Sequence, residues 1–152
     1  MADTWDIVRQ AVVAKLDGAT GIRRATADVD EPLQCPEIRV MNPDFELLQQ
    51  TGNTERYILT FPFEIVVSRP AGMKRSNVIA SDLARAVQER FFTGVSMSGV
   101  VSSPISIEDA RLGTMVPGLT DYAEQDADGR EKYDGYRGTV IVQVYETLTR
   151  TA

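Results

Sequence analysis

Apolar and polar residues alternate most clearly between residues 57 and 67, where six apolar side chains occupy the odd positions: Tyr57, Leu59, Phe61, Phe63, Ile65 and Val67. Successive side chains of an extended chain point to opposite faces, so these six share one face of a long β-strand. Pro62 has no N–H to donate to a neighbouring strand, which predicts an edge position or a bulge there. Ile58 and Val66 indicate that the opposite face is partly covered too.

Two other segments carry the spacing of amphipathic helices. Apolar residues recur at helical intervals from Thr4 to Leu16. The second helix is expected from Ser76 to Phe92, with Ser76 as its N-terminal cap. Its apolar positions follow at i+4 and should pack on a face of the sheet: Ile79, Leu83 and Val87.

The rest of the chain adds shorter strands and one long connection. Strands are expected within 21–30, at Glu37–Met41, at Val100–Glu108 and in a long closing run around 136–147, whereas Asp44–Gln50 is ambiguous between a helical turn and a strand. Residues 111–133 form a connection rich in glycine and acids. This order predicts a single α+β domain over residues 1–152. It should contain a mainly antiparallel β-sheet of four or more strands, two packed α-helices and a long acidic loop before the last strand.

Composition narrows the function classes. The 152 residues hold 22 acids and 16 bases, a net charge of −6, which argues against binding nucleic acid through a basic surface. Histidine is absent and Cys35 is the one cysteine, so neither a histidine-based catalytic triad nor an internal disulfide can form. No signal peptide or membrane-spanning segment is apparent, and we expect neither secretion nor membrane anchoring.

The carboxylates are the remaining candidates for catalysis or metal binding. Glu124, Asp126 and Asp128, followed by Gly129, fall where a calcium-binding EF-hand loop places its first ligands, but the twelfth position is Gly135 instead of glutamate. A solvated acidic loop explains this segment better than a metal site. We therefore expect no enzymatic activity, no metal and no cofactor.

Two features favour assembly with other chains. The 111–133 connection is longer than a compact domain ordinarily holds without a function for it. Arginine outnumbers lysine thirteen to three, and arginine pairs more readily with carboxylates at interfaces.

The order of elements resembles the tail terminator (tail completion) proteins of long-tailed bacteriophages, the lambda gpU-like group. The resemblance rests on the helix at Thr4–Leu16, the proline-flanked strand at Pro36–Met41, the long strand at Arg56–Arg69 and the helix at Ser76–Phe92. It continues with a strand near Ile105, a loop rich in Gly, Pro and Asp, and the closing run Tyr136–Glu146.

This resemblance implies a structural subunit without catalytic residues. Such subunits form a ring, expected to be a homohexamer, at the head-proximal end of the tail tube, where they stop tube polymerisation. The implied partners are the tail tube protein and a head-completion or stopper protein of the neck. DNA passes through the channel without sequence-specific binding. The protein would be made in the host cytoplasm and end in the virion tail.

The acidic loop supplies the candidate residues for the lumen or for a contact with the tube or a neighbouring subunit. They are the densest acidic set and two basic residues among them: Asp121, Glu124, Asp126, Asp128, Arg130, Glu131, Lys132 and Asp134. Fixed negative charge repels phosphate, which would let DNA slide. Arg130 and Lys132 are the candidate cross-subunit partners of the acids.

The sequence is also compatible with other functions. A head–tail connector or stopper has a related role and equally few motifs. A small carboxylate-based enzyme or ligand-binding domain is the alternative from another class, and it would need a concave pocket with perturbed carboxylates.

Overall fold

The computed structural model describes residues 4–27, 33–69, 73–93, 99–102, 104–120 and 132–148. Within them lie two helices, α1 (Thr4–Asp17) and α2 (Met73–Thr93). Eight strands accompany them: β1 (Arg24–Thr26), β2 (Glu37–Val40), β3 (Asp44–Thr51), β4 (Thr54–Ser68), β5 (Gly99–Ser102), β6 (Ile105–Leu112), β7 (Val116–Pro117) and β8 (Tyr133–Thr147).

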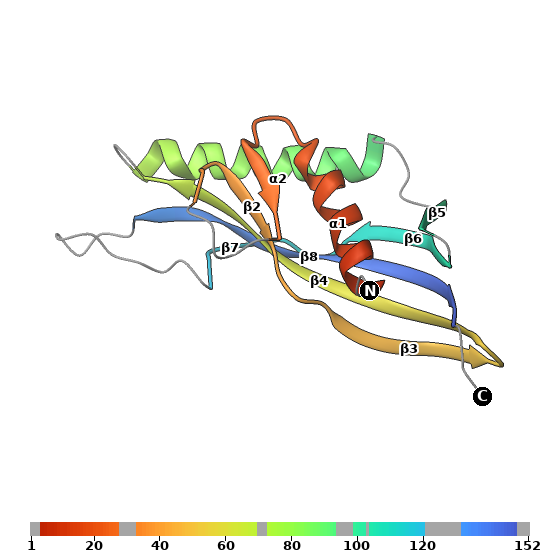
Figure 1. Cartoon of the computed structure of the whole chain (residues 1–152). Coiled ribbons are helices and arrows are strands. Elements are labelled where there is room, and N and C mark those ends of the chain that lie inside the picture. The colour runs from red at the N-terminus through yellow and green to blue at the C-terminus, as the bar shows by residue number, and fades with distance from the viewer. Residues whose placement is uncertain are drawn as a thin grey trace.

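All eight strands belong to one sheet, whose main order is β1-β2-β4-β8-β6-β5. In addition, β3 pairs with β4 and β7 pairs with β8. Only the β1–β2 pairing is parallel, and the other pairings are antiparallel. Both helices lie on one side of the sheet (Figure 1). The predicted α+β fold with a mainly antiparallel sheet and two helices is therefore confirmed.

The core lies between the helices and the face of β4 that the alternation pattern predicted. All six odd-numbered apolar residues of β4 are buried, with exposed fractions of 3% or less. The β4–β8 register places Val140, Val142 and Val144 beside them on the same face. From α2, Leu83 and Val87 are buried in this cluster, and Ile79 packs against it half-buried. The predicted packing of α2 on the sheet is confirmed.

The expectation for Pro62 was wrong. Strand β4 lies inside the sheet, and its pairing with β8 runs past Pro62 without a register shift. The other neighbour of β4 changes here, because β3 stops pairing at Thr60 and β2 begins pairing at Phe63. The carbonyl of Pro62 accepts a hydrogen bond from the Met41 N–H on that side (2.8 Å). The missing proline N–H thus falls at the break between two partner strands, where it costs little.

Several predicted boundaries also shift. Helix α2 begins at Met73, three residues before the predicted cap, and the buried Ser76 hydroxyl contacts the Asp134 carboxylate (3.5 Å) from inside the helix. The segment expected as one strand at Val100–Glu108 is the hairpin of β5 and β6. The long connection starts later than predicted, because β6 extends to Leu112.

The ambiguous segment Asp44–Gln50 is strand, and it forms a hairpin with β4. Thr51 pairs with Thr54 across a two-residue turn of Gly52 and Asn53. Gly52 has a φ of 60°, and no non-glycine residue of the described chain has a positive φ. A positive φ at the first central position alone is the pattern of a type II′ turn, whose twist suits hairpins.

We predict that Gly135→Ala destabilises the fold by about 2 kcal/mol or more, as overpacking does. A Cβ at Gly135 would lie 1.7 Å from the carbonyl oxygen of Ile65, and this backbone atom cannot move without disturbing the β4–β8 ladder. Denaturant unfolding measures the change. Gly18→Ala is the control, because the atoms nearest its Cβ belong to the flexible Arg90 guanidinium, which can move at the expense of its 3.0 Å hydrogen bond to the Lys15 carbonyl. Equal stability of the two variants would contradict the tight approach at Gly135.

Candidate functional site

Most of the predicted acidic set cannot be placed. Asp121, Glu124, Asp126, Asp128, Arg130 and Glu131 lie outside the described residues. Asp134 is described, and its carboxylate lies 3.4 Å from Arg69 Nη2 and accepts the Gly135 N–H at 2.9 Å. Lys132 has an exposed side chain, and its carbonyl accepts the Arg69 N–H at 3.0 Å. Asp134 therefore fastens the start of β8 to the end of β4, and a role of either residue at the lumen or between subunits stays a prediction.

Three buried glutamates are the first places to look for acid–base chemistry, and each has partners within the chain. Glu37 forms ion pairs with Arg24 and with the buried Arg39. The Glu64 Oε1 accepts hydrogen bonds from the backbone N–H (2.7 Å) and the hydroxyl of Thr120. The Glu146 carboxylate accepts a hydrogen bond from the Tyr57 hydroxyl at 2.8 Å. Across the described part of the chain, no cluster of three His, Cys, Asp or Glu side chains could hold a metal ion.

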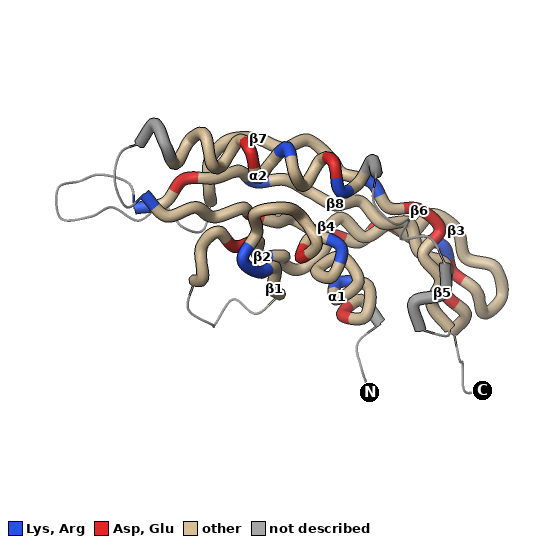
Figure 2. The backbone as a smooth tube through the Cα atoms, turned by 90° about the horizontal axis from the view of Figure 1, so that it is seen from above, with Lys and Arg blue, Asp and Glu red and all other residues tan. Residues whose placement is uncertain are grey.

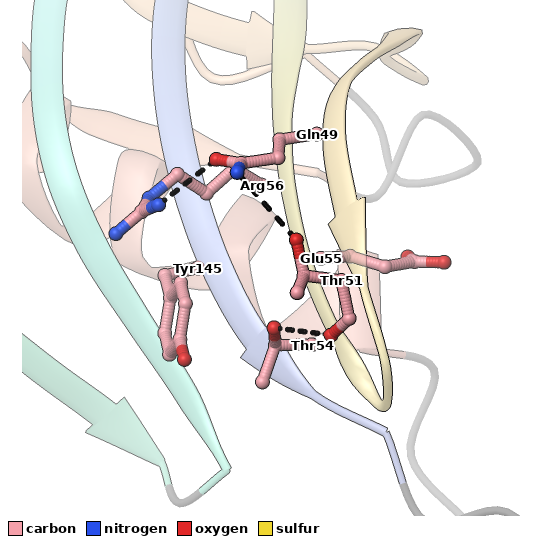
Figure 3. A pocket seen from close by; sticks show the side chains of 6 residues that line it. All are labelled: Gln49, Thr51, Thr54, Glu55, Arg56 and Tyr145. Atoms are coloured by element: carbon pink, nitrogen blue, oxygen red, sulfur yellow. Dashed lines mark hydrogen bonds between the residues drawn. The ribbon is translucent and has the colours of Figure 1, made fainter.

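Two surface hollows of moderate size lie on the sheet face opposite the helices. One, of about 240 Å³, lies at the turn of the β3–β4 hairpin and is lined by Gln49, Thr51, Thr54, Glu55, Arg56 and Tyr145 (Figure 3). The Arg56 guanidinium in this hollow already has partners. It stacks over the Tyr145 ring at 5.0 Å and contacts Glu108 (3.0 Å) and Gln49 (3.1 Å). The other, of about 270 Å³, lies near Pro62, Val116 and Arg137. Glu64 and Thr120, whose hydroxyl donates to the Glu64 carboxylate, also line this second hollow.

Cys35 also lacks the environment of a reactive thiol. Burial raises the pKa of this thiol, and the nearby Glu37 carboxylate raises that pKa further. A raised pKa lowers the fraction of thiolate, which is the nucleophilic form.

The exposed surface that stands out is the hairpin at the end of the sheet, which we call the β3 arm (Asp44–Thr60). All eight residues of β3 are exposed, and the large apolar ones are Phe45, Leu47 and Leu48, with 44–46% of their surface accessible. Among the described strands, β3 pairs with β4 alone. The arm extends past the ends of both helices (Figure 1). It therefore offers both apolar side chains and an unpaired strand edge.

The base of the arm is held firmly to the core. The ring of Trp5 from α1 stacks on Phe45 with centroids 5.1 Å apart, and Phe45 contacts the ring of Tyr57 at 5.3 Å. Tyr57 is 1% exposed, and its hydroxyl bonds to Glu146 on β8. These contacts join α1, β3, β4 and β8, so the arm is a preorganised surface.

Sequence reasoning missed the arm because it left Asp44–Gln50 without an assignment. A signal was present, since Phe45, Leu47 and the Gly52-Asn53 turn stand directly before the strongest strand pattern of the chain. Turn and alternation together are typical of a hairpin. What the sequence did not show is that the helices end before they cover it.

Comparison of the sequence with known protein-family models and with curated proteins gave no match. Of the described helices, none has the length and apolar character needed to cross a bilayer.

We predict that the Tyr57–Glu146 contact gives stability with a defined pH dependence. Burial raises the pKa of Tyr57, and the hydrogen bond to Glu146 raises that pKa further. The folded state therefore holds this proton more tightly than the unfolded state. The contribution of the Tyr57–Glu146 contact to stability is complete below about pH 10. Above that pH it falls by up to about 1.4 kcal/mol per pH unit.

Tyr57→Phe tests this contact by denaturant unfolding. At pH 7 it should cost about 1–3 kcal/mol, because Glu146 loses its buried donor. Above pH 10 its stability should fall less steeply than that of the unchanged protein. Tyr145→Phe is the control, since that hydroxyl forms no hydrogen bond with any residue that the structure describes. Parallel pH profiles for the Tyr57→Phe variant and the unchanged protein would contradict the assignment.

Proposed function

We propose that this protein is a structural virion subunit that forms a ring at the head-proximal end of a phage tail tube. The ring ends tube polymerisation and joins the tail to the neck. The observation that carries the proposal is the β3 arm, an exposed apolar strand edge held rigidly by the core. The order of helices and strands, which carried the resemblance to tail terminator proteins, adds support because the α+β fold is the one that this resemblance implies.

An exposed edge strand is a hazard for a protein that works alone. Monomeric proteins usually blunt such edges with lysine or proline, with a bulge that twists the edge away, or with a covering element. Strand β3 contains neither lysine nor proline. Its charges are Asp44 and Glu46, and despite them and the register shift at Leu48 three large apolar side chains stay exposed. A surface of this kind supports assembly with another chain.

The charge of the chain agrees with a channel for DNA. Each copy carries a net charge of −6, so a ring of six copies would carry about −36. Negative charge facing the lumen repels the phosphates and lets the genome pass without adhering. The intrachain partners of Glu37, Glu64 and Glu146 further support a structural role over carboxylate-based catalysis.

The ring is tested by mass photometry of the purified protein. The chain has a mass of 16.8 kDa, so six copies should appear as a particle of about 101 kDa. The same protein should bind the ends of purified tail tubes, seen by negative-stain electron microscopy. A strict monomer that never joins tube ends would contradict the proposal.

A further inference from the structure

On the side of the sheet opposite the β3 arm, part of strand β6 also forms an unpaired edge. Strand β5 pairs with β6 only at Ile105–Ile107, so the outer edge of residues 108–112 has no strand beside it within the described part of the chain. We call this segment the β6 edge. It is exposed or half-buried throughout, and acidic and basic positions both occur at this end of the sheet (Figure 2).

We propose that the β3 arm of one copy pairs with the β6 edge of the next copy, so that the sheet continues from subunit to subunit. The binding partner of the β3 arm is therefore a second copy of this chain. This inference rests on the proposed function, since it names the surface by which the ring would close.

Strand direction permits this pairing. From β3 through β4 and β8 to β6, each strand runs antiparallel to its neighbour. The β3 strand of a second copy in the same orientation therefore runs antiparallel to β6. The register shifts at Leu47/Gln49 in β3 and Ile107/Asp109 in β6 confine a regular ladder to Asp44–Leu47 and the end of β6 from Ala110 onward. The contact joins two different surfaces. Such a head-to-tail contact ends only when a ring closes.

The side chains on the two edges match on both faces of the sheet. On the helix-covered face, Phe45 and Leu47 stand on β3, and Ala110 and Leu112 stand on β6. On the other face β3 presents Asp44 and Glu46, while β6 presents Asp109 and Arg111. Within the described residues, neither Glu46 nor Arg111 has an ion-pair partner. A continuous sheet would thus join two apolar pairs and the one acid–base pair Glu46 and Arg111.

One register satisfies these pairings together. Placing Glu46 opposite Arg111 puts Phe45 opposite Leu112 and Leu47 opposite Ala110. A slip of one residue would oppose residues from different faces. A slip of two would separate Glu46 from Arg111 and, in one direction, place it opposite Asp109.

Charge also disfavours the symmetric alternative, in which two β3 strands pair with each other. Strand β3 carries Asp44 and Glu46 and no basic residue. Self-pairing would bring four carboxylates to one interface without a cation, whereas the β6 edge adds Arg111 beside its own Glu108 and Asp109.

Cysteine trapping tests the register in the full-length protein. Opposed antiparallel residues have Cα atoms about 4.5–5.5 Å apart, which a disulfide can bridge. The variant Leu47→Cys/Ala110→Cys, with Cys35→Ser to remove the native thiol, is oxidised with copper phenanthroline. We expect a ladder of covalent oligomers on a non-reducing gel, and monomers for each single-cysteine control.

The outcomes separate this inference from the proposed function. Dimers from Leu47→Cys alone, or no ladder from the double variant, would overturn the β3–β6 pairing. Rings of the unchanged protein on tube ends, together with no ladder, would overturn this interface and leave the proposed function standing. A ladder from a protein that never binds tube ends would support the pairing and refute the tail function.

Charge reversal gives a second readout by mass photometry. Glu46→Arg or Arg111→Glu alone should weaken association about tenfold per contact, and the double reversal should restore it. Asp82→Arg, an exposed reversal on α2, is the matched control and should leave association unchanged. Single reversals that behave like this control would overturn the proposed register.

Discussion

The pairing of β4 with β8 determines most of the architecture. Each strand has 15 residues, and they pair along their whole length without a register shift. Fifteen residues of antiparallel strand span about 50 Å, whereas the 21 residues of α2 span about 32 Å. Helix α2 alone therefore cannot cover the full length of these strands, and the β3 arm extends past the ends of both helices (Figure 1). The exposed arm is a direct consequence of this difference in length.

The same pairing makes the arm rigid. Because β4 belongs to both the core and the arm, the buried Phe61 and Phe63 and the arm residue Tyr57 lie on one continuous strand. The hydrogen bond from Tyr57 to Glu146 and the stack of Trp5 on Phe45 hold the arm at its base. A rigid interface loses little conformational entropy when a partner binds, which favours association.

The sequence predicted the parts of the fold that depend on local periodicity. Alternation from Tyr57 to Val67 identified the buried face of β4, and i+4 spacing identified Leu83 and Val87 as its partners. Pairing partners were not predictable in this way. Pro62 was assigned to an edge or a bulge because the sequence does not show that β2 and β3 share one side of β4 and meet there.

The candidate site was harder to predict than the fold, for a physical reason. The sequence predicted a site at residues 121–134, because a cluster of acidic residues can be recognised without a structure. Edge exposure is a tertiary property, because Phe45 and Leu47 are residue types typical of a core and yet keep 44–46% of their surface accessible. The segment that best supports assembly is therefore one that the sequence alone leaves ambiguous between a helical turn and a strand.

Hydrogen–deuterium exchange tests the central claim, that the two sheet edges meet between copies. Amides of residues 44–51 and 108–112 would be compared in assembled particles and in monomers obtained by dilution. We expect slower exchange in both segments on assembly, with amides of the exposed face of α2 unchanged. Equal exchange of both edge segments in the two states would contradict the account.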